Sequence, residues 1–281
     1  MISRYRVKVL PSKQNRSDRY TLDLLDAEFG STRLISLQSK DIADFRDARL
    51  GVGRAPATVV KDLNLLRVLV DYAIQDMGIY LPSNPARSVK NPSVKNSRDR
   101  VFMQDEERIL FSAFTHPMLP AIATLAIETA CRLGELLNME WKDIDLAKRT
   151  VFLPKTKIGE SRTIPLSSVA IKTLHKIPRA FEGGRAFGCW ARVDSFEKVF
   201  KRALIRARTS YEKECALEGT NPHPTMLNNL RFHDLRHIAT SRLAKRFPNV
   251  IELSRITGHK DLKSLSRYYH VSIEDLALRM A

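Results

Sequence analysis

Two histidines, an arginine and a tyrosine near the C-terminal end of the chain have the types and spacing to act together on a phosphate. His233 and Arg236 are three residues apart, so a helix would place them on one face. The planar guanidinium of Arg236 can donate to two phosphate oxygens at once. His233 and His259 can donate a hydrogen bond or move a proton near neutral pH. Tyr268 carries a phenol that can attack phosphorus once it is deprotonated.

A matching arginine, Arg132, lies far upstream between two apolar stretches, within Thr-Ala-Cys-Arg-Leu-Gly-Glu. An unpaired charge between two buried helices is costly, so Arg132 needs an anionic partner. Glu135 supplies only one negative charge. Taken singly, each of these residues is more commonly a satisfied buried group or a surface charge. Because the arginine and the C-terminal set occur together, the phosphate site is the better interpretation.

Hydrophobic periodicity predicts that mainly helical elements position these residues. The clearest stripe is an amphipathic helix over 57–77, with Gly78 as its stop. Residues 1–38 give no firm prediction. The other predicted helices cover residues 40–50, 105–114, 118–130, 167–177, 195–208, 233–247, 249–257 and 261–269, with a final helix that opens at Ser272.

A β-hairpin is predicted between the two halves of the site. The β-forming stretches 150–153 and 162–164 flank a turn that contains Gly159. Lys157 would lie near the tip of this hairpin, where a solvated lysine is the commoner outcome.

Charge favours a nucleic-acid partner. The 47 Lys and Arg residues outnumber 31 Asp and Glu residues, which gives a net charge of +16. This balance suits a polyanion, with nucleic acid ahead of a membrane surface, although a soluble basic protein of another kind could share it.

No metal site, cofactor site or membrane segment is predicted. Cys131, Cys189 and Cys215 are isolated, without zinc-type spacing, and suggest a reducing compartment. His233 and His237 lack the glutamate of His-Glu-x-x-His. With no signal peptide and no apolar run of membrane-spanning length, we expect a cytoplasmic protein.

Three regions are expected along the chain: a helical domain over 1–85, a basic linker over 86–101 and a second domain over 102–281. The linker would either run along a phosphate backbone or act as a solvated tether. Its basic residues are Arg87, Lys90, Lys95, Arg98 and Arg100.

The order and spacing of the motifs resemble those of the tyrosine recombinases, the phage integrase family, over most of 100–275. The motifs are Thr-Ala-Cys-Arg-Leu-Gly-Glu, Lys-Ile-Gly-Glu-Ser-Arg-Thr-Ile-Pro-Leu, His-Asp-Leu-Arg-His, Thr-Gly-His-Lys-Asp-Leu and Arg-Tyr-Tyr-His-Val. The resemblance implies a mainly α fold with a small β-sheet. It also implies a two-domain C-shaped clamp around DNA, in which a helical core-binding domain precedes a mixed α/β catalytic domain. A separate arm-binding module is not expected, and the short first helix suggests a trimmed N-terminus.

The resemblance also implies the reaction, in which a site-specific recombinase cleaves and rejoins DNA through a 3′-phosphotyrosine for integration, excision or inversion. The nine-residue interval from His259 selects Tyr268 as the nucleophile and makes Tyr269 the variable neighbour. The resemblance also implies that Arg132 and Arg236 clamp the phosphate oxygens and that His259 donates a further hydrogen bond to them. It implies that Lys157 protonates the leaving 5′ oxygen and that His233 assists proton transfer at the tyrosine. Glu135 would hold the first arginine in place.

The implied partner is a duplex DNA recombination site. We expect a monomer in solution and a homotetramer in the DNA synapse, with accessory DNA-bending proteins as further partners. The apolar stripe Ile273, Leu276, Ala277 and Met280 would pack on its own domain or dock on a neighbouring protomer. Two alternatives remain: a type IB topoisomerase, and a DNA-binding regulator with an inactive recombinase fold.

Overall fold

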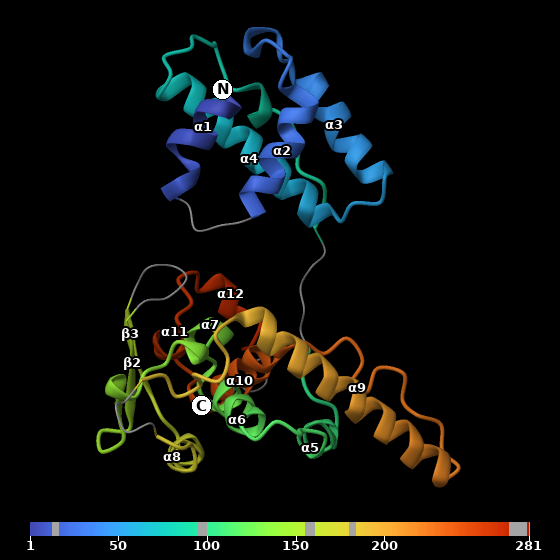
Figure 1. Ribbon diagram of the computed structural model, residues 1–281, viewed down its shortest axis with the longest axis vertical. Coiled ribbons are helices and arrows are strands. Elements are labelled where there is room, and N and C mark those ends of the chain that lie inside the picture. Colours follow the sequence, from blue (N-terminus) through green and yellow to red (C-terminus); the bar gives the residue numbers. More distant parts are fainter. Residues whose placement is uncertain (13–16, 95–99, 155–160, 180–183, 270–279, 281) are drawn as a thin grey trace. The chain divides into compact units, whose positions relative to one another are not determined.

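The structure is a computed structural model that describes residues 1–12, 17–94, 100–154, 161–179, 184–269 and 280. The chain forms two compact units, Met1–Ser97 and Arg98–Ala281 (Figure 1). The division falls inside the region expected to be a linker. In the part of the chain that is described, no helix combines the length and apolarity that would be needed to cross a membrane.

The first unit is all helical. The predicted central helix is confirmed as α4 (Pro56–Gln75), and it buries Leu63, Leu66 and Val70 completely. At Gly78 the backbone takes a φ of 67°, which lets the Ile79 N–H turn back to Ala73 O at 3.0 Å. The α-helices of this unit are α1 (Ile2–Lys8), α2 (Ser17–Phe29), α3 (Ser39–Gly51) and α4 (Pro56–Gln75).

The beginning of the expected linker is packed onto this helical unit. Ala86 and Val89 are buried in its core, and Arg67 of α4 donates to their carbonyl oxygens at 2.9 and 2.8 Å. Arg87 forms an ion pair with Asp71 at 2.7 Å. The beginning of the linker is therefore not the extended tether that its basic residues suggested, because its two apolar side chains pack into this core.

The second unit is mainly helical with one small sheet, which lies at one edge of the unit in Figure 1. Its core gathers side chains from three helices around Phe196, Phe200 and Phe232. The α-helices of the unit are α5 (Glu106–Ser112), α6 (Leu119–Thr129), α7 (Leu133–Leu137), α8 (Ser168–His175), α9 (Val193–Leu217), α10 (Phe232–Arg246), α11 (Val250–Thr257) and α12 (Lys263–Ser266).

The predicted hairpin is confirmed. β2 (Thr150–Leu153) pairs antiparallel with β3 (Arg162–Pro165), so that Val151 faces Ile164, and β1 (Ile144–Asp145) adds to the other edge of β2. Val151 and Ile164 are fully buried against the helices. Lys157 falls outside the described residues, as does the C-terminal stripe apart from Met280.

Three helices carry the C-terminal half of the expected site. α10 packs on α6 and α11, and α11 packs on β3. Leu265 of α12 is fully buried with Leu253 of α11 and Ala244 of α10. This small cluster fixes the segment that follows α12, which contains Tyr268.

Candidate active site

Arg132 and Glu135 form a tight local pair at the start of α7. Arg132 is the N-cap residue, and its backbone N–H donates to Glu135 Oε2 at 2.9 Å while its Nη1 donates to Oε1 at 2.9 Å. Glu135 is buried, and Arg132 remains partly exposed, with 20% of its side-chain surface accessible. The carboxylate thus holds the guanidinium of Arg132 and leaves the remaining N–H groups for an anion.

Arg162 shares the same carboxylate from β3. Its two terminal nitrogens donate to the two oxygens of Glu135 at 2.9 and 2.8 Å, as a bidentate pair. Burial raises the pKa of Glu135, but the hydrogen bonds from Arg162 and from the Arg132 backbone, with the charges of both arginines, bring the pKa down to about 2. Glu135 is therefore an anion at neutral pH, clamped between two arginines.

Arg236 on α10 is held by backbone carbonyls. Its Nη1 donates to Ala130 O, and its Nη2 donates to Thr257 O at 2.7 Å. Ala130 caps α6 in the left-handed region with a φ of 53°. Burial, together with the charge of Arg132, lowers the pKa of Arg236 to about 10, so it stays charged at neutral pH. Two of its N–H groups orient the fork, and others remain for an anion.

His259 is held in one tautomer by Thr257. The Thr257 hydroxyl donates to Leu253 O at 2.8 Å, so it must accept the 2.7 Å bond from His259 Nδ1. Burial and the charges of Arg236 and Arg132 lower the pKa of His259 to about 3. At neutral pH, Nδ1 therefore carries the one ring proton, and Nε2 faces Arg236 Nη2 at 3.4 Å as an acceptor.

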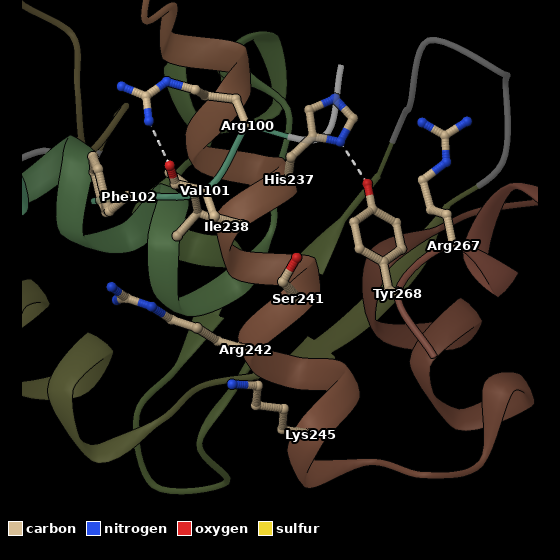
Figure 2. A pocket seen from close by; sticks show the side chains of 10 residues that line it. All are labelled: Arg100, Val101, Phe102, His237, Ile238, Ser241, Arg242, Lys245, Arg267 and Tyr268. Atoms are coloured by element: carbon tan, nitrogen blue, oxygen red, sulfur yellow. Dashed lines mark hydrogen bonds between the residues drawn. The ribbon is translucent and has the colours of Figure 1, made fainter. Parts of the chain in front are cut away.

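The Tyr268 hydroxyl meets the imidazole of His237, as Figure 2 shows. Tyr268 Oη and His237 Nδ1 are 2.5 Å apart. Both residues line a cavity of about 520 Å³ whose wall also carries the basic residues Arg100, Arg242, Lys245 and Arg267. Arg100 and Arg242 already pair with Glu106 and Glu107. The phenol therefore lies in a cavity that is lined by basic residues.

Tyr269 serves a different purpose from its neighbour. Its hydroxyl donates to Phe247 O at 2.8 Å, at the end of α10. Its ring packs against the cluster of Ala244, Leu253 and Leu265. Tyr269 thus ties the segment after α12 to α10, while the hydroxyl of Tyr268 faces the cavity.

The structure brings together most of the residues that the sequence singled out. His233 lies one turn before His237, with ring centroids 5.3 Å apart. Desolvation, followed by the charges of His237 and Arg236, lowers the pKa of His233. Of the linker residues, Arg87 and Arg100 have acidic partners, Lys90 is exposed, and Lys95 and Arg98 lie outside the described residues.

Sequence reasoning missed two side chains, Arg162 and His237, and the carbonyls that hold Arg236. Arg162 stood in the quoted hairpin motif, and His237 stood in His-Asp-Leu-Arg-His, but neither was given a role. The net charge of the cluster is +2, because three arginines contribute +3 and one glutamate contributes −1. The cluster consists of Arg132, Arg162, Arg236 and Glu135. This excess suits a phosphate diester with its transition-state charge.

Gly258 gives a test of how closely Arg162 must pack. At Gly258 φ is 69°, and an added Cβ would lie 2.9 Å from the guanidinium of Arg162. Gly219 has nearly the same φ, 68°, with nothing within 4 Å of an added Cβ. Both alanine variants should lose about 1–2 kcal/mol of unfolding free energy to backbone strain, and Gly258→Ala should lose more in urea denaturation. If Gly258→Ala and Gly219→Ala lose the same unfolding free energy, the close approach of Gly258 to Arg162 does not contribute to stability.

The lowered pKa of His259 predicts a loss of stability in mild acid. The unfolded histidine takes a proton near pH 6.5, whereas the folded one does so only near pH 3. Between these values the unfolded state binds more protons, so the unfolding free energy falls as the pH falls. One such group contributes at most about 1.4 kcal/mol per pH unit, less where solvent screens it. His259→Gln should flatten the dependence between pH 6.5 and 4.5 in denaturation curves, and an unchanged slope would contradict the assignment.

The sequence profile described as the phage integrase family matches residues 102–275. A shufflon-specific DNA recombinase of Escherichia coli is 34% identical over 250 residues, which are 85% of this chain and 59% of that protein. The chain thus spans less than two thirds of that relative.

Solved structures resemble the fold. The Tn1549 transposon integrase in complex with transposon right end DNA superposes with a TM-score of 0.74 at 17% identity, over 99% of this chain and 96% of that one. A lambda integrase tetramer bound to a Holliday junction gives 0.67 at 19% identity, over 92% and 76%. At these identities the likeness shows the fold, which agrees with the predicted helical fold with a small sheet.

Proposed function

The chain belongs to the phage integrase family, and from that premise we propose that it is a site-specific tyrosine recombinase that cleaves and rejoins duplex DNA. The observation that carries the proposal is the +2 cluster of Arg132, Arg162, Arg236 and Glu135, with His259 against Arg236. The same unit holds the hydroxyl of Tyr268 against His237, in a cavity lined by basic residues. Such a cluster requires an anion, and the phenol offers a nucleophile for it.

The proposed reaction proceeds in two reversible steps. Tyr268 Oη bonds to phosphorus as the bond from phosphorus to the 5′ oxygen breaks, which leaves a 3′-phosphotyrosine and a 5′ hydroxyl. A 5′ hydroxyl then attacks the phosphotyrosine and releases the tyrosine. Because the ester keeps the bond energy, no nucleotide cofactor is needed. Lys157 is the proposed acid at the leaving oxygen.

The arginines are proposed to stabilise the charge that develops on the phosphate. Arg236 is pre-oriented by two carbonyls and Arg132 by Glu135, so neither must reorganise when the phosphate arrives. His259 presents Nε2 as an acceptor in the structure, so a hydrogen bond from it to phosphate requires a second proton. A bound phosphate between Arg236 and His259 would favour that protonation by its negative charge.

The proposal is tested with a labelled DNA duplex nicked next to the scissile phosphate, on which the cleaved end diffuses away. A covalent DNA–protein adduct that resists denaturation is expected. Its absence, with DNA binding intact, would favour the inactive regulator. If the adduct forms, exchange of strands between two duplexes is expected, and relaxation of supercoils alone would favour a topoisomerase.

The DNA contacts and the assembly are proposed on other grounds. The basic balance of the chain and the DNA complexes of its structural neighbours support binding to duplex DNA. The tetramer of lambda integrase on a Holliday junction supports assembly of several protomers on DNA. We propose a homotetramer as the recombining form.

Fewer basic residues of the linker are proposed to contact DNA phosphates than its total positive charge suggests. Since Arg87 and Arg100 are engaged with Asp71 and Glu106, Lys90, Lys95 and Arg98 are proposed to contact phosphates. Replacing these three with glutamine should flatten the slope of log K against log salt by about 0.9 for each lost phosphate contact. An unchanged slope would show that they do not touch the DNA backbone.

A further inference from the structure

The proton of the attacking tyrosine needs an acceptor, and the structure places one beside it. His237 Nδ1 is 2.5 Å from Tyr268 Oη. The two rings lie nearly parallel, at 28°, with centroids 6.2 Å apart. This is within the reach that a general base requires of the proton it removes. By contrast, family resemblance gave the assisting role to His233.

We propose that His237 is the general base that takes the proton of Tyr268 during cleavage and returns it during rejoining. The inference rests on the proposed function. In the cleavage step the Tyr268 O–H bond breaks, its proton passes to His237 Nδ1, and the freed electron pair forms the bond to phosphorus. The bond from phosphorus to the 5′ oxygen breaks, and that oxygen takes a proton from the acid. In rejoining, every transfer runs in reverse.

The fold positions both His237 and Tyr268, so that their side chains contact each other. His237 lies on α10, where the next two residues, Ile238 and Ala239, are buried. Tyr268 is fixed by its N–H bond to Leu265 O at 2.9 Å and by the anchoring bond of the adjacent Tyr269 to Phe247. The pair is therefore formed before any substrate binds, which is what an efficient base needs.

The groups that face His237 set its charge balance. His233 packs against His237 on α10. The charge of His237 also contributes to the lowered pKa of His259, which follows α11. Arg100, Arg242, Lys245 and Arg267 share its cavity. By their charge, these cations stabilise a phenolate and destabilise an imidazolium, whereas the negative charge of a phosphate diester that enters the site acts in the opposite direction on each.

His233 lies one helical turn before His237, the residue that is proposed to take the proton. Its ring stands edge-on to that of His237, at an interplanar angle of 87°. Desolvation and the charges of His237 and Arg236 lower the pKa of His233. It is placed to contact the substrate or to tune His237, and it serves as the matched comparison in the same helix.

The test compares His237→Gln with His233→Gln on the nicked duplex in single-turnover experiments. Glutamine can hydrogen-bond to the phenol but cannot take its proton. Adduct formation by His237→Gln should slow by about a hundredfold or more at pH 7, as expected for loss of a general base. Its rate should then rise about tenfold per pH unit toward the ordinary pKa of a phenol, about 10. DNA binding and thermal stability are measured alongside, and His237→Asn replaces any variant that does not fold.

A more acidic phenol separates base catalysis from other roles. Incorporating a fluorinated tyrosine at position 268 should restore much of the rate of His237→Gln and should do little for His233→Gln. Retention of the normal rate by His237→Gln would overturn the proposal. The proposal would also be overturned if His237→Gln were slow and neither high pH nor the fluorinated tyrosine restored its rate. It would be overturned as well if the fluorinated tyrosine restored the rate of His233→Gln alone. Failure of the unmodified protein to form any adduct would instead count against the proposed function.

Discussion

Tyr268→Phe is expected to form no covalent adduct with the nicked duplex, because the substitution removes only the hydroxyl that attacks phosphorus. The variant should bind DNA as the unmodified protein does. It should lose about 1 kcal/mol of stability with the hydrogen bond to His237. The measurement is the fraction of labelled DNA that stays with protein under denaturing conditions, beside the binding isotherm and a urea titration.

Tyr269→Phe is the matched control, since it removes a hydroxyl from the adjacent tyrosine. The variant loses the 2.8 Å bond to Phe247 O, which should cost about 0.5–1.5 kcal/mol of stability. Adduct formation should persist, slowed only by the looser anchoring of the segment after α12. An adduct that survives in Tyr268→Phe and vanishes in Tyr269→Phe would shift the assigned nucleophile by one residue.

The choice between these tyrosines shows what the sequence could predict. The interval from His259 selected Tyr268 as the expected nucleophile, and the structure gives the two hydroxyls different partners. Helix α4 and the hairpin were predicted because their apolar side chains follow one periodicity over several turns or a full strand. The fold class followed from the family resemblance, which the order and spacing of the motifs carry.

The missed elements had weaker local signals. α2 buries Leu22, Leu25 and Phe29, but these lie among polar residues in a stretch that gave no firm prediction. α9 was expected to end at residue 208 and continues to Leu217. Tyr211 and Cys215 extend its stripe at intervals of four after Ala207, and the intervening Thr and Ser concealed that continuation.

The missed parts of the site depend on tertiary contacts. Arg162 meets Glu135 across 27 residues of sequence, and nothing local identifies the acid that a strand arginine will reach. The carbonyls of Ala130 and Thr257 carry no residue signature, because every residue has a carbonyl. His237 could be read from the motif, but its relation to Tyr268 requires the packing of α12 on α10 and α11.

Arg236→Lys is expected to reduce adduct formation by a hundredfold or more, in line with the roughly 10²–10³ that loss of one transition-state donor costs. Arg236 donates to two carbonyls through different terminal nitrogens and keeps further N–H groups for the phosphate. Lysine has one nitrogen and cannot meet both carbonyls and the phosphate in that geometry. The positive charge is retained, so affinity for DNA should change little.

The exposed Arg246, on the last turn of the same helix, provides the control. Arg246→Lys should leave both binding and cleavage unchanged. Because Arg236→Lys leaves a buried carbonyl without its donor, its stability should fall by about 1–3 kcal/mol, and adduct formation is therefore measured below its unfolding transition. As a second variant, Arg236→Ala should regain part of its activity from added guanidinium ion at low concentration but not from an ammonium ion. Equal losses of binding and cleavage in Arg236→Lys, without rescue of Arg236→Ala, would make Arg236 a residue that binds DNA and not one that stabilises the transition state.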